Sequence, residues 1–262
     1  MSRLEEVVKS QPSEEEASGI EELREANEAN EADEAITELL VRATTRQQCN
    51  RVMGCSAGDE LIALGTLAVQ PIMERYREMP GWSYQRIHLL ELLGRIGARS
   101  SVDLLVEQLA ARSWDARAQA AIALGRMGAT EQLERLRGAL AGVAETDRGY
   151  QYALAFAVEK LGGIGGKEIL VAALDRERVA GTNWGYTMVA AAAVGELGVA
   201  EACPLLVHSL HHRDIFLIKA ALASAASLGC RDLAPEIRPL LDSPVPSVRR
   251  EAERALAAIG VK

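Results

Sequence analysis

Aromatic residues are scarce in this chain, which has 3 Trp, 5 Tyr and 2 Phe among its 262 residues. Ala, Leu and Gly are abundant instead. This balance disfavours a sheet core, which is usually rich in Val, Ile and Tyr. It favours thin layers of helices, because small side chains let neighbouring helices approach closely. The composition therefore predicts an all-α fold.

Long apolar runs are absent as well. No stretch approaches the roughly 20 apolar residues that a membrane-spanning helix needs. The first residues are acidic and lack the basic start and hydrophobic centre of a secretory signal. We therefore expect no membrane span and a cytoplasmic protein.

Cysteine is also rare. Four cysteines, at positions 49, 55, 203 and 230, are too few and too scattered to form a disulfide framework in a chain of this length. We expect reduced thiols that are buried as small apolar residues. Cys49 and Cys55 are close in sequence, but two cysteines without a nearby His make a poor zinc site.

The negative charge is concentrated at one end. Residues 1–34 hold twelve acidic residues against Arg3, Lys9 and Arg24, a net charge of −9. The whole chain carries −8, so residues 35–262 carry +1. Residues 1–32 have few apolar side chains, which predicts a disordered or marginally helical acidic tail. Residues 33–262 then form the folded part.

Seven glycines mark a repeat, and we call them the ladder glycines. They recur at intervals of 31 to 37 residues, at Gly65, Gly97, Gly128, Gly165, Gly198, Gly229 and Gly260. A period in this range indicates stacked units that bury their apolar faces against one another. Glycine suits the left-handed position that ends a helix. Each full unit reads as two helices, for example over 102–110 and 115–127.

The first unit looks shortened. Ile36, Leu39, Leu40 and Ala43 have the i, i+3, i+4, i+7 spacing of one helix face. Residues 54–58 then interrupt the pattern before Gly65. Terminal repeats are often atypical, so we expect an N-terminal capping unit.

The repeats resemble the HEAT-like family, in particular its short phycobilisome-lyase variety. Residues 247–260 carry the best copy of the pattern, and Arg117 with Ala120, Leu124 and Gly128 carries another. The resemblance implies a right-handed α-solenoid of about six to seven helix pairs. It implies no single function, because such repeats serve scaffolds, lyases, hydroxylases and DNA-repair enzymes. Deoxyhypusine hydroxylase resembles this pattern but carries paired His-Glu motifs for iron, and this chain has no His-Glu dipeptide.

One repeat position collects large aromatic residues. In four units a glycine stands three residues before the ladder glycine. Eleven or twelve residues before that earlier glycine stands a large aromatic residue, namely Trp82, Trp114, Tyr150 or Trp184. These side chains could plug the turn between the two helices of a unit. They could also form a row of exposed anchors along one rim, suited to a partner. The second interpretation gives the candidate binding residues.

Another position collects arginine. Arg86, Arg117 and Arg249 stand eight residues before the same glycine position, and the column is interrupted at Leu154, Thr187 and Ile218. On a concave face these residues could bind a partner, with the acidic tail competing for them. They could equally pair with acids of their own solenoid. The interruption argues against a continuous phosphate-tracking stripe, so we do not expect nucleic acid as partner.

No metal or cofactor site is predicted. His208, His211 and His212 cluster at the end of a first helix, with Asp214 just after them. His208 and His212 have the i, i+4 spacing that can hold a metal, but neither neighbour is a clear third ligand. The helix dipole alone favours cations at that helix end. No catalytic triad or phosphate-binding loop can be assembled.

The favoured function is a non-enzymatic scaffold or adaptor that binds a protein partner through the concave face and the turn rim. The resemblance leaves two alternatives open. One is a chromophore-handling subunit like those of bilin lyases, and the other is a HEAT-like DNA-binding or DNA-repair protein. The sequence does not predict the oligomeric state.

Overall fold

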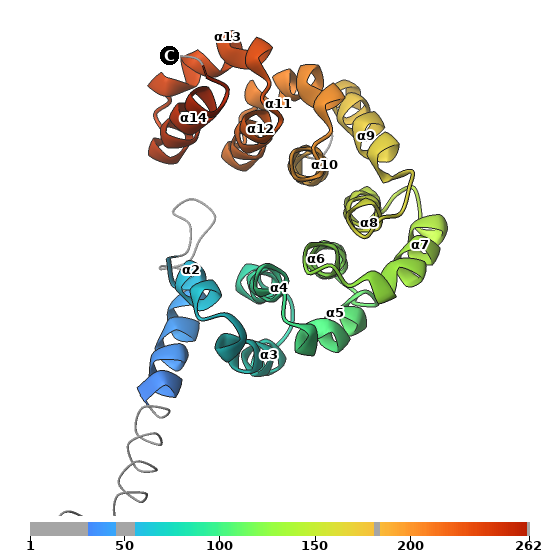
Figure 1. The fold of residues 1–262 in the computed structure, drawn as a ribbon, viewed down its shortest axis with the longest axis vertical. Coiled ribbons are helices and arrows are strands. Elements are labelled where there is room, and N and C mark those ends of the chain that lie inside the picture. The colour runs from blue at the N-terminus through green and yellow to red at the C-terminus, as the bar shows by residue number, and fades with distance from the viewer. Residues whose placement is uncertain (1–30, 46–55, 181–183, 261–262) are drawn as a thin grey trace, which may run out of the picture.

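The computed structural model describes residues 31–45, 56–180 and 184–260, and within these ranges it consists of helices and turns without a strand. The helices form a curved double row (Figure 1). The first helices of the units make the outer row and the second helices make the inner row, which lines the concave side. The predicted all-α solenoid is confirmed.

Six helix pairs can be counted in the described part of the chain. The outer row consists of α3 (Val69–Glu78), α5 (Val102–Gln108), α7 (Leu133–Gly142), α9 (Gly166–Ala180), α11 (Val207–Leu210) and α13 (Ala234–Ile237). The inner row consists of α4 (Tyr84–Ile96), α6 (Trp114–Arg126), α8 (Arg148–Lys160), α10 (Trp184–Leu197), α12 (Ile215–Leu228) and α14 (Pro246–Ala258). Short 3-10 turns lead into the outer helices: η1 (Gly65–Ala68), η2 (Arg99–Ser101), η3 (Thr130–Gln132), η4 (Ala200–Leu206) and η5 (Arg231–Leu233). A further 3-10 turn, η6 (Arg238–Asp242), continues α13.

A helix over residues 31–43 and α2 (Ser56–Ala63) precede these pairs. Ile36, Leu39, Leu40 and Ala43 are all buried, as their spacing predicts. These two helices cover the apolar end of the array, which is the role of a terminal cap. Residues 1–30 of the acidic tail, Cys49 and Cys55 lie outside the described residues, and residues 31 and 32 already belong to the first helix. None of the described helices is both long and apolar enough to cross a membrane.

The ladder glycines end their helices in the left-handed conformation, as expected, with one correction. Gly128, for example, has φ +69°, and the next N–H, of Ala129, donates to the Leu124 carbonyl at 3.1 Å. In the fourth unit the equivalent bond runs from the Gly163 N–H to the Val158 carbonyl at 2.8 Å. The helix-ending glycine there is therefore Gly162 and not Gly165. Both have positive φ, which is why the glycine-rich run is ambiguous in sequence.

A second set of glycines sets the distance between inner helices. A Cβ added to Gly94 would lie 2.6 Å from both Cα and Cβ of Ala123, so α4 touches α6 at backbone level. A Cβ at Gly125 would lie 2.9 Å from Cα of Ala157 on α8. Such distances are far inside van der Waals contact. Each of these glycines stands three residues before its ladder glycine and faces a small residue of the next inner helix.

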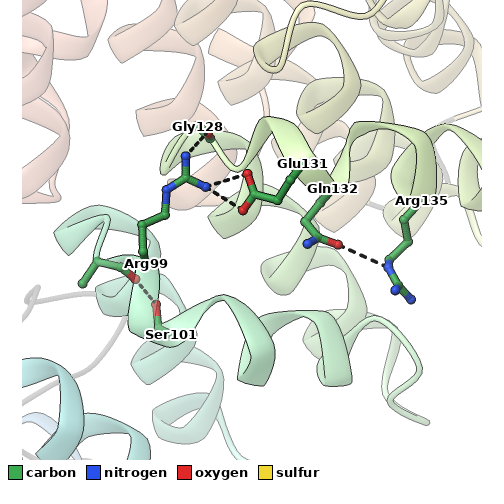
Figure 2. A network of polar contacts seen from close by, with 7 residues as sticks. Arg99, Ser101, Gly128, Glu131, Gln132 and Arg135 are labelled. Carbon is green, nitrogen blue, oxygen red and sulfur yellow. Dashed lines mark hydrogen bonds and ion pairs between the residues drawn. The ribbon is translucent and has the colours of Figure 1, made fainter.

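Outer turns are joined by polar contacts as well (Figure 2). One guanidinium nitrogen of Arg99 donates to both carboxylate oxygens of Glu131, at 2.6 and 2.7 Å. The other donates to the Gly128 carbonyl at 3.3 Å. This links the turn that follows α4 to the turn that follows α6, one repeat further along.

The prediction of reduced thiols is wrong for Cys203 and Cys230. They form a disulfide, with their Cα atoms 5.6 Å apart. Cys203 belongs to η4 and Cys230 immediately precedes η5, so the bond joins the outer elements of two successive units. They are 27 residues apart, close to one repeat period, and equivalent places in neighbouring repeats are neighbours in space. Scattered positions in sequence are therefore no argument against pairing in an array.

The close helix contact predicts opposite effects at two helical glycines. Gly94→Ala should lower the free energy of unfolding by about 1–3 kcal/mol, because α4 and α6 must separate to accept a methyl group. Gly138→Ala in α7, where an added Cβ has nothing within 4 Å, should raise it by about 0.5–1 kcal/mol through helix propensity. Urea unfolding of both variants measures the difference. Equal effects would contradict the packing argument.

Removing the disulfide should destabilise the array. The double substitution Cys203→Ala and Cys230→Ala should lower the free energy of unfolding by about 2–4 kcal/mol, because the unfolded chain loses a cross-link. Thermal unfolding with and without a reductant measures this. The reductant should lower the Tm of the wild type and leave that of the double variant unchanged.

Candidate functional site

The turns between the two helices of a unit form one edge of the solenoid, and we call this edge the turn rim. Trp82 lies on it, directly before α4, and its side chain is 62% exposed. Its indole N–H donates to a carboxylate oxygen of Asp115 on α6 at 3.0 Å. The polar end of the ring is thus fixed by the next unit, while most of the ring faces solvent.

The turn that carries Trp82 is held from both sides. Gly81 has φ +66°, which a residue with a side chain would adopt only under strain. The Arg86 guanidinium folds back and donates to the Gly81 carbonyl at 2.7 Å. The hydroxyl of Ser83 accepts from the Arg86 backbone N–H and caps α4. Trp82 therefore projects from a well-determined turn.

Trp114 is the first residue of α6 and is only partly exposed. Its ring meets that of Tyr186 on α10 edge to face, with centroids 5.3 Å apart. Between them lies Gly149 of α8, whose added Cβ would collide with both rings. Trp114 thus packs within the inner row, against a ring two units further along the array.

Tyr150 does not share the position of the tryptophans. It is 7% exposed, and its hydroxyl donates to the Leu109 carbonyl at 3.4 Å. Tyr150 stands twelve residues before Gly162. The buried Ala116 and Leu217 likewise stand twelve residues before the ladder glycines that end their own helices. The error came from counting back from the wrong glycine position. Arg148 occupies the position of Trp114, and its guanidinium lies 5.6 Å from the centroid of Tyr186.

Trp184 begins α10, at the same repeat position as Trp114, but its side chain is outside the described part. Among the described side chains of this row, the indole of Trp82 is exposed, that of Trp114 is packed and Tyr150 is buried. Whether any of them binds a partner stays a prediction.

The arginine column has one shared structural role. Each guanidinium returns to a carbonyl of the turn that precedes its own helix. Arg117 donates to the Ala111 carbonyl at 2.8 Å, and Arg249 donates to the Ser243 carbonyl at 2.6 Å, as Arg86 does to Gly81. When repeat positions on α8 are counted from Gly162 instead of Gly165, the residue that interrupts the arginine column there is Gln151 and not Leu154. These bonds satisfy turn carbonyls that the helices leave unpaired.

Two of these arginines also cover tyrosine rings. Arg86 lies 4.3 Å from the centroid of Tyr76, and Arg117 lies 5.2 Å from that of Tyr150. Burial raises the pKa of both tyrosines, and the arginine charges offset part of that rise. Arg117 is further ion-paired with Asp147, the residue before α8. The partner-binding role of the arginines is untested, but their charges are already engaged by their own chain.

A polar band crosses the inner row near the other ends of its helices. On α4, Nδ1 of His88 lies 3.1 Å from Glu91. Arg126 of α6 forms a two-point ion pair with Glu196 of α10, in which Nε donates to Oε2 at 3.0 Å. Lys160 of α8 reaches the Glu196 carbonyl at 3.5 Å. Sequence reasoning missed the Arg126–Glu196 pair, because its two members come from units that are not adjacent.

Ionisation within the band follows from these contacts. Burial alone would raise the pKa of Glu91, but the hydrogen bond from His88 and the charges of His88, Arg126 and Arg95 outweigh it, so its pKa is lowered. Burial likewise opposes the charge of Arg126, yet the bond to Glu196 keeps the Arg126 pKa above its usual value. Both groups are therefore charged at neutral pH.

The histidines at the end of α11 have other partners. Nε2 of His211 lies 2.6 Å from Glu236, and Nδ1 of His212 accepts from the Asp214 backbone N–H at 3.0 Å. Over the described ranges, no three His, Cys, Asp or Glu side chains gather where they could hold a metal ion.

Known proteins resemble this chain in its repeats. Residues 71–155 match the family model of HEAT repeats. Among solved structures, human deoxyhypusine hydroxylase in complex with glycerol aligns at 17% identity with a TM-score of 0.48, covering 89% of this chain and 98% of that one. No curated protein matches. The chain therefore carries HEAT-like repeats, and the match does not extend to the phycobilisome-lyase variety.

The lowered pKa of Glu91 predicts a pH-dependent contribution to stability. Its ionised form is favoured in the folded state, so the contribution is present at neutral pH and disappears as pH falls below about 4. Because the side chain is 36% exposed, Glu91→Gln should cost at most about 1 kcal/mol at pH 7. Glu134→Gln, at an exposed i, i+3 pair, is the control and should cost almost nothing. A Glu91→Gln effect that persists at pH 3 would contradict the electrostatic cause.

Proposed function

We propose that this HEAT-like repeat chain is an interaction scaffold that binds a protein partner along its concave face and at the turn rim beside Trp82. The observation that carries the proposal is the exposed, fixed indole of Trp82. Tryptophan is enriched among the residues that dominate binding energies at interfaces.

The turn around Trp82 supports this role. The bonds from Arg86 to Gly81 and from Trp82 to Asp115 hold the ring before any partner arrives. A side chain that is already ordered loses little entropy on binding. In this arrangement Arg86 positions the anchor from behind.

The other candidate residues differ in how deeply they are buried and in where they lie along the array. Trp114 and Arg117 would shape the neighbouring part of the rim through their own packing. Arg249 lies on the last inner helix, far along the array from Trp82 (Figure 1). Tyr150 is buried and supports the rim from within. The proposed contact surface is therefore centred on Trp82 and the adjacent inner helices α4 and α6.

Neither alternative gains support from a specific observation. A nucleic-acid surface would present unengaged arginines, whereas Arg86, Arg117 and Arg249 are bonded to turn carbonyls. A planar chromophore would call for several parallel exposed rings, and Trp114 packs edge to face against Tyr186.

Site-specific photo-crosslinking in the native cell tests the proposal. A photoreactive amino acid at position 82 should capture a discrete protein partner, and the same group at Ile164, which is 86% exposed on a turn that follows α8, should not. In a binding assay with the captured partner, Trp82→Ala should weaken affinity at least about tenfold, while Ile164→Ala leaves it unchanged. Equal capture at both positions would refute a specific surface. Crosslinks to nucleic acid would support the DNA-binding alternative instead.

A further inference from the structure

The hydrophobic core of the solenoid is divided at α8. Ala153 and Ala157, on one face of this helix, belong to the apolar cluster that runs back to the N-terminal cap. Tyr152 and Phe156, on another face, belong to the cluster that continues through α10, α12 and α14. The two clusters therefore meet along this helix, where the partly buried Ile122, Leu140 and Val189 pack against both of them. A stack of repeats bends most readily where the fewest fully buried side chains join its units.

Two contacts pass over α8 and join the helices on either side of it. The first is the ion pair between Arg126 on α6 and Glu196 on α10, whose side chains are 27% and 34% exposed. Ion pairs such as that of Arg99 with Glu131 join neighbouring units instead. This pair skips a whole repeat.

The second contact lies at the opposite end of the same helices. The rings of Trp114 on α6 and Tyr186 on α10 meet above Gly149, the second residue of α8. Any side chain at this position would collide with both rings. The glycine thus leaves the space through which α6 and α10 reach each other.

The outer helices α7 and α9 pack against the convex side of α8 (Figure 1). We infer that side chains of α6 and α10 that reach across α8 do so on its concave side. The burial of Phe156 agrees with this. It is 2% exposed, whereas residues at the same repeat position in neighbouring helices, Ile122 and Ala192, are partly exposed. The contacts across α8 therefore shield its concave face.

We propose that α8 is the hinge of the solenoid and that two clasps, the ion pair Arg126–Glu196 and the ring contact Trp114–Tyr186, hold the arc in its curved form. If the arc opens about α8, the distances between helices increase most on the concave side of the arc. The two clasps lie on that side and therefore oppose the opening. The ring contact is insensitive to salt. The ion pair is partly exposed, so added salt weakens it and releases one of the two clasps. This device does not depend on the proposed partner.

Distance measurements between the two arms test the hinge. Spin labels on unnatural amino acids at Leu67 and Asp242, both exposed and on opposite sides of α8, report the opening by pulsed electron resonance. Glu196→Gln should shift the distance distribution to longer values at low salt. The wild type should show a similar shift in 1 M NaCl, where the screening length falls to about 3 Å. The variant should respond little to salt.

A matched control and a second readout complete the experiment. Glu131→Gln weakens an arginine–glutamate ion pair between adjacent units, and it should leave the distances unchanged. Hydrogen exchange should quicken in peptides from α8 in Glu196→Gln and to a greater extent in Glu196→Gln combined with Trp114→Leu. Unchanged distances and exchange in the combined variant, with the fold retained by circular dichroism, would overturn the proposal. Equal opening in Glu131→Gln would also do so.

Discussion

The backbone-level contact between consecutive inner helices is the constraint on which the rest of the structure depends. Gly94 against Ala123, and Gly125 against Ala157, bring these helices closer than any larger pair of side chains would allow. The short spacing on the inner side fits the curvature of the row, whose inner helices line the concave side. It also allows side chains to reach past one helix to the next, as the contacts across α8 do.

Within this frame, one repeat position can hold several kinds of contact. The arginines at 86, 117 and 249 all bond to turn carbonyls, yet only Arg117 also pairs with the next unit. The tryptophans at 82 and 114 both lie at the turn rim, but one is exposed and the other packs on Tyr186. Their neighbours decide the difference. Gly149 admits the ring of Trp114, whereas the indole of Trp82 is bonded to a carboxylate at its edge and is mostly exposed.

The sequence was sufficient for the fold because period, helix spacing and helix-ending glycines all reflect local geometry. Ile36, Leu39, Leu40 and Ala43 illustrate this, since burial follows directly from their spacing. Local geometry failed where several glycines follow one another, and choosing Gly165 over Gly162 moved Tyr150 into the wrong column. Local geometry could not predict the contacts between units. The Cys203–Cys230 bond could have been suspected from a separation near one period, but nothing in the sequence brings Arg126 to Glu196, two units away.

The disulfide makes the two ends of the array unequal in stability. It ties together the outer elements of the fifth and sixth helix pairs, and within residues 31–45, 56–180 and 184–260 the earlier pairs have no such cross-link. In a linear array each unit is stabilised by its own contacts and by its neighbours. Under oxidising conditions the C-terminal units therefore form the most persistent block, and loss of structure starts at the opposite end and advances toward it. The repeats that follow one another so regularly in sequence are then unequal in lifetime, and proteolytic fragments of the chain should retain its C-terminal half.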